Sequence, residues 1–348
     1  MHKETGDIDI TESGLDRRKF IGGVAAALPA GMLLSGIGAP SAMARELASA
    51  ASAGPLSKPL TIAFPQTGGT TLEFFTVVFN GARAAAKDLG VKLNITQTGT
   101  FDVNQQGKMV TAAIASKPDG IITGNWNASA MKAPITTAVK QGIPVVIYNS
   151  NDPAGPAVDG ALTFVGQDDV VAGHQAGAQF KAAGVKKALI ANSDPSASNL
   201  RTRIKAFKEG FGGPTVLVNA GISNQTASEA AIKAAIQANP GCNGVFATGG
   251  PAGEPAIAAV TALNKLGKLK MATYDITPKI LSTINAGHML FAIDQQPFIQ
   301  GYYPVVILAL YKRLGITPVA GESLLTGPAF VTKQNAAKVI KLSAQGLR

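Results

Sequence analysis

From Pro59 onward, the chain alternates short apolar runs with longer amphipathic stretches. The apolar runs are 60–64, 91–96, 120–123, 144–148, 162–165, 188–191, 215–218, 244–247, 271–274 and 290–293. The amphipathic stretches between them include 74–89, 103–115, 168–183, 200–211, 227–238 and 251–266. Strands and helices that alternate in this way predict parallel sheets with both faces covered by helices. Ten strands exceed one comfortable open sheet, so we expect an α/β fold with two doubly wound lobes.

The residues before this alternation have the pattern of an export signal. Residues 1–19 are polar and end in Asp16-Arg17-Arg18-Lys19, and no charged residue follows over 20–44. The run Arg17-Arg18-Lys19-Phe20-Ile21 resembles the twin-arginine motif, which directs folded proteins across the bacterial inner membrane. Ala42-Met43-Ala44 then matches the small-residue pattern of a cleavage site.

We therefore expect a cleavable signal peptide over 1–44, a small-residue linker over 45–57 and a periplasmic mature protein. Two alternatives stay open. Asp16 stands where the twin-arginine pattern usually has Ser or Thr, so the general secretory route is the second option for export. Cleavage after Ala50 or Ala53 also fits the sequence.

The formal net charge of +10 is a reason to consider a nucleic-acid partner. Removing residues 1–44 takes away four basic and five acidic residues, so the basic excess belongs to the remaining chain. Its lysines are scattered along the predicted helices, as at Lys181, Lys208, Lys265 and Lys338. We interpret this pattern as a basic surface and expect no nucleic-acid partner.

The reactive residues of an enzyme are sparse. A single cysteine, Cys242, excludes a disulfide framework, and with only three histidines it argues against a metal site. The sequence contains no H-E-x-x-H, G-x-S-x-G or Walker pattern. His174 falls within a predicted helix and His288 at a helix end, where both suit structural roles. We predict no catalytic residues, no metal, no cofactor and no enzymatic activity.

Ligands of doubly wound lobes bind beyond the carboxyl ends of the strands. In this chain those ends are rich in amides, hydroxyls and carboxylates, at 66–71, 124–127, 149–152, 192–194, 249–250, 275 and 294–296. Aromatic side chains accompany them at Phe74, Phe75 and Trp126. Polar groups beside aromatic faces suit a polyhydroxylated ligand, because its hydroxyls can pair with amides and carboxylates while its C–H face packs on the rings.

Taken in order, these segments resemble the periplasmic sugar-binding proteins of the type I fold, the ribose- and galactose-binding group that serves ATP-binding-cassette importers. The segments that carry the resemblance are 61–63, Phe74-Phe75, 80–82, 142–146 before Asn149, 165–168, Arg201-x-Arg203 before Phe207, Asp275 after Tyr274, 294–297 and 300–302. The resemblance runs from Leu60 to the last residues.

The resemblance implies two lobes joined by three crossings, near Phe164-Val165, Gln295-Gln296 and Leu325-Thr326-Gly327. The N-terminal lobe would comprise 58–164 and 296–325, and the C-terminal lobe 165–295 and 326–348.

Roles for individual side chains also follow from the resemblance. Phe74 and Phe75 match paired phenylalanines that flank a sugar ring. Arg201 matches an arginine that forks onto the ring oxygen and hydroxyls. Asp275 matches a carboxylate that accepts from two hydroxyls, and Gln295 matches an amide at a hinge crossing.

The chain departs from the ribose-binding pattern at three places, so we do not expect a ribose pocket. Asn149-Ser150 replaces an Asp-Arg pair, Gly249-Gly250 replaces Asn-Asp, and Ser223 or Asn224 replaces an aromatic residue. We expect the backbone N–H groups at Gly250 to donate to a ligand oxygen. Trp126 either supplies the missing stacking face or is an ordinary half-buried aromatic.

The expected function is therefore that of a monomeric periplasmic solute-binding protein, which captures a small sugar or polyol by hinge closure and delivers it to an ABC permease. One alternative is a receptor that presents its ligand, or a furanone-type signal, to a membrane sensor. Sugar-responsive repressors share the core, but the uncharged Gly- and Pro-rich stretch within 1–57 is incompatible with a recognition helix.

Overall fold

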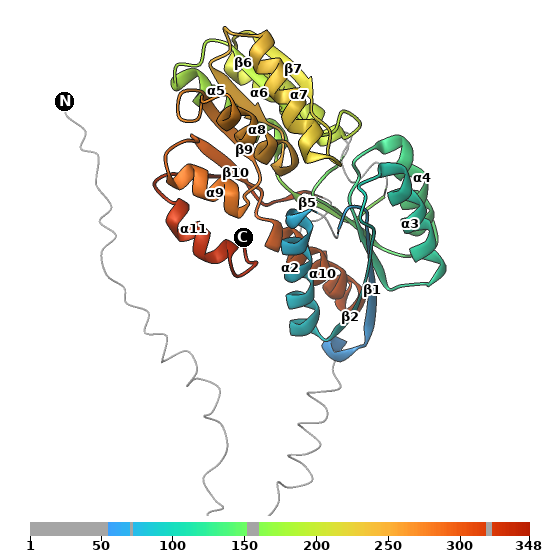
Figure 1. Cartoon of the computed structure of the whole chain (residues 1–348). Coiled ribbons are helices and arrows are strands. Elements are labelled where there is room, and N and C mark those ends of the chain that lie inside the picture. The colour runs from blue at the N-terminus through green and yellow to red at the C-terminus, as the bar shows by residue number, and fades with distance from the viewer. Residues whose placement is uncertain (1–54, 70–71, 152–159, 318–321) are drawn as a thin grey trace, which may run out of the picture. The chain divides into compact units, whose positions relative to one another are not determined.

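The computed structural model describes residues 55–69, 72–151, 160–317 and 322–348, which lie within one compact unit, Ser52–Arg348. The predicted signal peptide over 1–44 and the alternative cleavage sites at Ala50 and Ala53 lie outside the described residues. Two six-stranded sheets organise the unit, and each forms the centre of a lobe (Figure 1). We call them the N-lobe and the C-lobe.

The N-lobe sheet has the strand order β11-β5-β4-β3-β1-β2, and all its strands are parallel. The strands are β1 (Leu60–Gln66), β2 (Val91–Gln97), β3 (Gly120–Thr123), β4 (Val145–Tyr148), β5 (Thr163–Gly166) and β11 (Leu324–Leu325). The helices of this lobe are η1 (Pro55–Ser57), α2 (Glu73–Leu89), α3 (Val103–Ala115), α4 (Ala128–Lys140) and α10 (Pro297–Leu314). Every residue of β3, β4 and β5 is buried, which explains why these strands appear in the sequence as continuous apolar runs.

The C-lobe sheet has the strand order β12-β10-β9-β8-β6-β7. Its strands are β6 (Ala188–Asn192), β7 (Thr215–Asn219), β8 (Gly244–Ala247), β9 (Lys270–Tyr274), β10 (Phe291–Asp294) and β12 (Ala329–Thr332). Its helices are α5 (Asp169–Ala182), α6 (Ser198–Phe211), α7 (Gln225–Ala238), α8 (Gly250–Ala262), α9 (Pro278–Asn285) and α11 (Ala336–Ser343). The other strands pair in parallel, and the edge strand β12, which the sequence did not predict, pairs antiparallel with β10.

Both faces of the C-lobe sheet are covered. Along β6, Ile190 joins a core with α5 and α6, whereas Leu189 and Ala191 join a second core with α7 and α8. This alternation is the two-residue period of a strand. The predicted pair of doubly wound α/β lobes is therefore confirmed.

The chain crosses between the two sheets three times, as expected. The crossings are β5 to α5, β10 to α10 and β11 to β12. Because the second crossing runs directly from β10 into α10, the residues between them, Gln295 and Gln296, belong to both lobes. The cavity described below opens beside this crossing.

Helices α2 and α10 pack closely through two glycines. A Cβ atom at Gly81 would lie 1.9 Å from the carbonyl oxygen of Phe298, and one at Gly301 would lie 1.8 Å from that of Val78. Only glycine permits this approach, which brings the backbones of α2 and α10 into close contact near the second crossing. Within the described residues, no helix combines the length and the apolar character needed to cross a bilayer.

Candidate functional site

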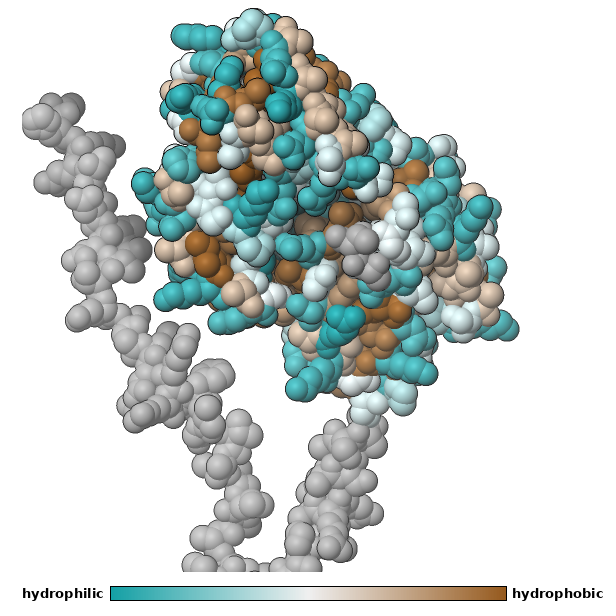
Figure 2. All heavy atoms as spheres, viewed as in Figure 1, coloured by the Kyte–Doolittle hydropathy of each residue, from teal (hydrophilic) through white to brown (hydrophobic). Residues whose placement is uncertain are grey.

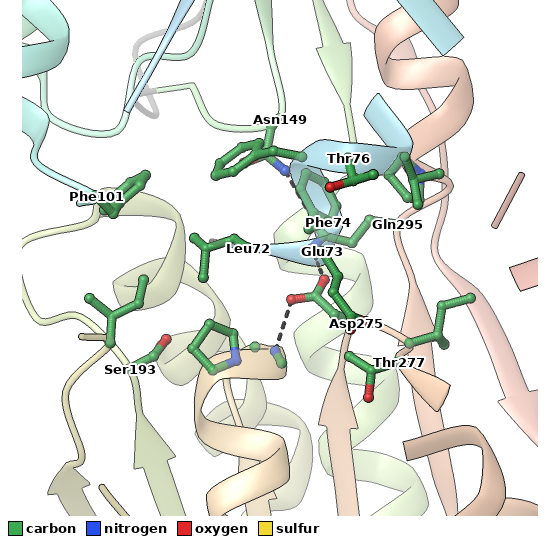
Figure 3. A pocket seen from close by; sticks show the side chains of 18 of the residues that line it. Leu72, Glu73, Phe74, Thr76, Phe101, Asn149, Ser193, Asp275, Thr277 and Gln295 are labelled. Carbon is green, nitrogen blue, oxygen red and sulfur yellow. Dashed lines mark hydrogen bonds between the residues drawn. The ribbon is translucent and has the colours of Figure 1, made fainter. Parts of the chain in front are cut away.

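A cavity of about 940 Å³ lies between the lobes and is lined by strand-end loops of both. Its volume is in the range of small-molecule sites, at the carboxyl ends of the strands where doubly wound folds bind ligands. Figure 2 shows hydrophilic residues over most of the visible face of both lobes, with hydrophobic residues in the hollow between them. In Figure 3, Leu72, Phe74 and Phe101 of the N-lobe lie above Ser193, Asp275 and Thr277 of the C-lobe.

Aromatic rings form the N-lobe wall. Phe74 and Phe75 occupy the first turn of α2, and their ring centroids are 5.5 Å apart. Phe101, from the loop between β2 and α3, lies nearly parallel to Phe75 with centroids 6.4 Å apart. Trp126, after β3, stands perpendicular to Phe75 and Phe101, at 6.2 Å and 5.4 Å. All four residues line the cavity.

Trp126 is held in place rather than free to move. It is 3% exposed, and its Nε1 donates to Asn149 Oδ1 at 3.2 Å. Its ring fills the space over Gly124, where a Cβ atom would lie 2.2 Å from the indole. Trp126 therefore serves mainly as a packed wall of the cavity, and Asn149 anchors it.

The C-lobe wall is organised by Arg203 of α6, which is 2% exposed. Its Nε donates to Asp169 Oδ1 at 2.8 Å, Nη1 to the Thr248 carbonyl at 2.9 Å and Nη2 to Gln295 Oε1 at 2.6 Å. The guanidinium also lies 4.1 Å from the centre of the Tyr274 ring. Three of the five N–H groups of the guanidinium make these bonds, which leaves two that can donate to a ligand.

The charge of Arg203 is secured by its neighbours. Burial alone would lower the pKa of Arg203, but the negative charge of Asp169, with smaller effects from Tyr274 and Asp275, raises it above its usual value. Burial also raises the pKa of Asp169, against the opposing charge and hydrogen bond of Arg203. We treat the pair as ionised because the guanidinium stays protonated and the two groups are in direct contact.

Asp275 and Gln295 form the centre of the site. Asp275 Oδ2 accepts from the backbone N–H of Gly250 at 2.9 Å, and Oδ1 accepts from Gln295 Nε2. Gln295 Oε1 in turn accepts from Arg203 and, at 3.4 Å, from Asn149 Nδ2 of the N-lobe. These hydrogen bonds, partly drawn in Figure 3, connect the two lobes through the hinge glutamine.

Two residues of this centre have an unusual backbone. Asn149 and Asp275 adopt positive φ values of 59° and 66°. Such conformations cost a non-glycine residue about 1–3 kcal/mol and are often found at functional sites. The lobes also touch directly across the cavity, where the N–H of Ser198 donates to the Trp126 carbonyl at 2.9 Å.

Seven of the nine residues expected at the site from the sequence line the cavity. Six of them are Phe74, Phe75, Trp126, Asn149, Asp275 and Gln295. Gly250 also lines it, but its N–H is occupied by Asp275, so the expectation that this group is free to donate to a ligand is corrected.

Arg201 and Asn224 do not line the cavity. The exposed Arg201 Nη1 donates to the carbonyls of Pro195 and Ser196, and the arginine of α6 that lines the cavity is Arg203. Asn224 caps α7, because its Oδ1 accepts from the Ala227 N–H at 3.0 Å. Its neighbours Ser223 and Gln225 line the cavity instead.

Sequence reasoning missed Glu73, Phe101, Asn199 and Glu254, which also line the cavity. For Arg203 a signal existed. Leu200, Ile204 and Phe207 are buried at helical spacing, and Arg203 shares their face of α6 whereas Arg201 does not. Among the described residues, no group of three or more His, Cys, Asp or Glu side chains is placed to hold a metal ion.

Comparisons with known proteins agree with this geometry. A family model described as a periplasmic binding protein domain matches residues 64–314. The xylose/arabinose-binding protein XylF of Sulfolobus acidocaldarius is 26% identical over 284 residues, covering 76% of this chain and 69% of that protein.

Solved structures include a carbohydrate transporter from Acidothermus cellulolyticus 11B in complex with myo-inositol. It is 32% identical with a TM-score of 0.77, covering 83% of this chain and 99% of that one. A periplasmic sugar-binding protein of an ABC sugar transporter from Legionella pneumophila is 25% identical with a TM-score of 0.69, covering 76% of this chain and 99% of that one.

Proposed function

Because this chain belongs to the periplasmic binding protein domain family, we propose that it captures one small sugar or polyol between its lobes for an ABC-type importer. It is a binding protein and not an enzyme. The observation that carries the proposal is the cavity itself, in which aromatic rings of one lobe face the hydrogen-bonded Arg203, Asp275 and Gln295 of the other lobe and the hinge.

The polar groups suit hydroxyl ligands. Asp275 accepts two hydrogen bonds within the protein and has lone pairs left for ligand hydroxyls, while Arg203 can donate two N–H groups. Each hydrogen bond to an ionised group contributes about 1.5–3 kcal/mol, so four or five support micromolar binding, near −8 kcal/mol, after association costs. Phe74, Phe75 and Phe101 would pack on the C–H face of the ring, with Trp126 behind them.

Hinge bending couples binding to delivery. Ligand that touches both walls binds the closed arrangement more tightly than the open one, and this difference is the only source of the shift toward closure. The closed protein, exported to the periplasm and acting as a monomer, would then present its ligand to an inner-membrane permease. The carbohydrate transporter from Acidothermus cellulolyticus 11B, which shares the fold and holds myo-inositol, supports a polyol or sugar as the ligand.

The test is a thermal-shift screen of the purified protein with myo-inositol, D-xylose, L-arabinose and D-glucose. A ligand at 100 times its Kd adds about 2.7 kcal/mol to the stability of the folded state. We expect at least one of the four ligands to raise the Tm. Asp275→Ala should lower the affinity for that ligand more than tenfold in calorimetry, whereas Arg201→Ala should leave the affinity unchanged. Absence of any shift with these ligands would contradict the proposal.

A further inference from the structure

Two glutamates line the cavity from opposite lobes. Glu73 occupies the first turn of α2 in the N-lobe, and Glu254 lies on α8 in the C-lobe. Glu254 Oε1 accepts from Thr277 Oγ1, whose residue follows Asp275 by two positions on the same loop. Figure 3 places Glu73, Asp275 and Thr277 in one region of the cavity.

Neither glutamate has a cationic partner in the part of the chain that the structure describes, where the ion pairs of Lys, Arg and His involve other carboxylates. The two arginines that line the cavity are already paired, Arg203 with Asp169 and Arg348 with the buried Asp294. The charge left uncompensated along the lining is therefore negative, from Glu73, Glu254, Asp194 and Asp275.

The negative charges of Glu73 and Glu254 repel each other. Partial burial raises the pKa of Glu73 above its usual value, and the negative charge of Glu254 raises it further. An ionised carboxylate only accepts hydrogen bonds, so a ligand that meets this pair has to supply O–H or N–H donors. An anionic group at the same place would meet repulsion from both walls.

Asn199 is a second, independent observation that favours a ligand in this cavity. Asn199, in the first turn of α6, lines the same cavity and is 7% exposed. Its Oδ1 has no hydrogen-bond partner among the described residues. A buried amide is usually satisfied by a partner, so this one is suited to a ligand group.

We propose that Glu73 and Glu254 are specificity-determining residues, which accept hydrogen bonds from ligand hydroxyls on both walls and exclude sugar acids and sugar phosphates. The inference rests on the proposed function of the cavity and deepens it, because it restricts the ligands to neutral polyols and sugars. Neutral ligands that lack donors toward this pair leave the Glu73 carboxylate and the second oxygen of Glu254 desolvated without a ligand donor, and they bind weakly.

The test compares Glu73→Gln and Glu254→Gln with the wild-type protein by calorimetry. The probes are myo-inositol, D-xylose, L-arabinose and D-glucose, with myo-inositol 1-phosphate and D-glucuronate as anionic counterparts. We expect the wild type to bind a neutral probe and neither anionic one. Each substitution should lower the affinity for the neutral probe at least tenfold, as expected for the loss of a hydrogen bond to a charged group. The double variant should bind the anionic counterpart more tightly than the wild type does.

Glu229→Gln is the matched control, because it removes the same charge from α7 in the C-lobe, outside the cavity. It should leave all affinities unchanged. If the wild type binds a neutral probe but both glutamine variants bind it equally well, or if the wild type binds D-glucuronate as tightly as D-glucose, the inference is wrong and the proposed function stands. If the wild type binds none of the neutral probes, both are overturned.

Discussion

Replacing Arg203 by Ala should cost far more stability than replacing Arg201, although the two arginines are only two residues apart. Arg203 is 2% exposed and is the cationic partner of Asp169, whose side chain is 10% exposed. Arg203→Ala leaves that carboxylate buried without its cation and removes the donors to Thr248 and Gln295. Breaking a buried ion pair by removing one partner costs about 3–5 kcal/mol, a large part of a typical total of about 5–15 kcal/mol.

Arg201 supplies the matched control. Its exposed guanidinium donates to two backbone carbonyls, so Arg201→Ala should change the free energy of unfolding by less than about 1 kcal/mol. Urea denaturation, followed by circular dichroism, measures the free energy of unfolding of both alanine variants. Asp169→Ala combined with Arg203→Ala should cost less than the sum of the two single changes, because the stranded charge is removed with its partner. Equal losses for Arg201→Ala and Arg203→Ala would refute the reasoning.

Three further predictions concern a cavity glutamate, the packing of α2 on α10 and the export signal. Because the pKa of Glu73 is raised in the folded protein, its contribution to stability is present below the unfolded-state value near 4.5 and is lost as the pH rises through the folded value. Ligand-free Glu73→Gln should therefore have a higher Tm than the wild type at pH 7, with the difference vanishing near pH 4; a constant difference across this range would contradict the assignment. Gly301→Ala should lower the free energy of unfolding by about 2 kcal/mol or more, measured by thermal unfolding, because its Cβ would lie 1.8 Å from the Val78 carbonyl oxygen. Gly241→Ala, which places its Cβ in open space, should lower the free energy of unfolding by less than half as much. Lys-Lys in place of Arg17-Arg18 should leave precursor in the cytoplasm by cell fractionation, and normal export of that variant would favour the secretory route.

Much of the fold could be predicted because its strands are buried on both faces. That burial turns β3, β4 and β8 into short apolar runs that stand out between amphipathic helices. Elements without such a signature were missed. Strand β11 has two residues and α9 has eight, so neither is long enough to show a clear pattern. Helix α4 contains Pro134, a residue that usually argues against a helix.

The site was predicted less completely because strand ends only say where a ligand lies. They do not say which neighbouring helical residues face it. Arg203 lines the cavity and Arg201 does not, because only Arg203 lies on the buried face of α6. Asn224 caps α7 and does not line the cavity. Phe101 and Glu254 belong to a loop and a helix that come to the cavity through the tertiary structure, and no local pattern marks them.

The central claim is that a neutral polyol or sugar binds between the lobes, and a crystal structure with the tightest-binding probe tests it most directly. The account predicts a ligand ring beside Phe75 and Phe101, with hydroxyls within hydrogen-bond distance of Asp275 and Arg203. A ligand bound outside this cavity, or one inside it that contacts neither Asp275 nor Arg203, would contradict the account.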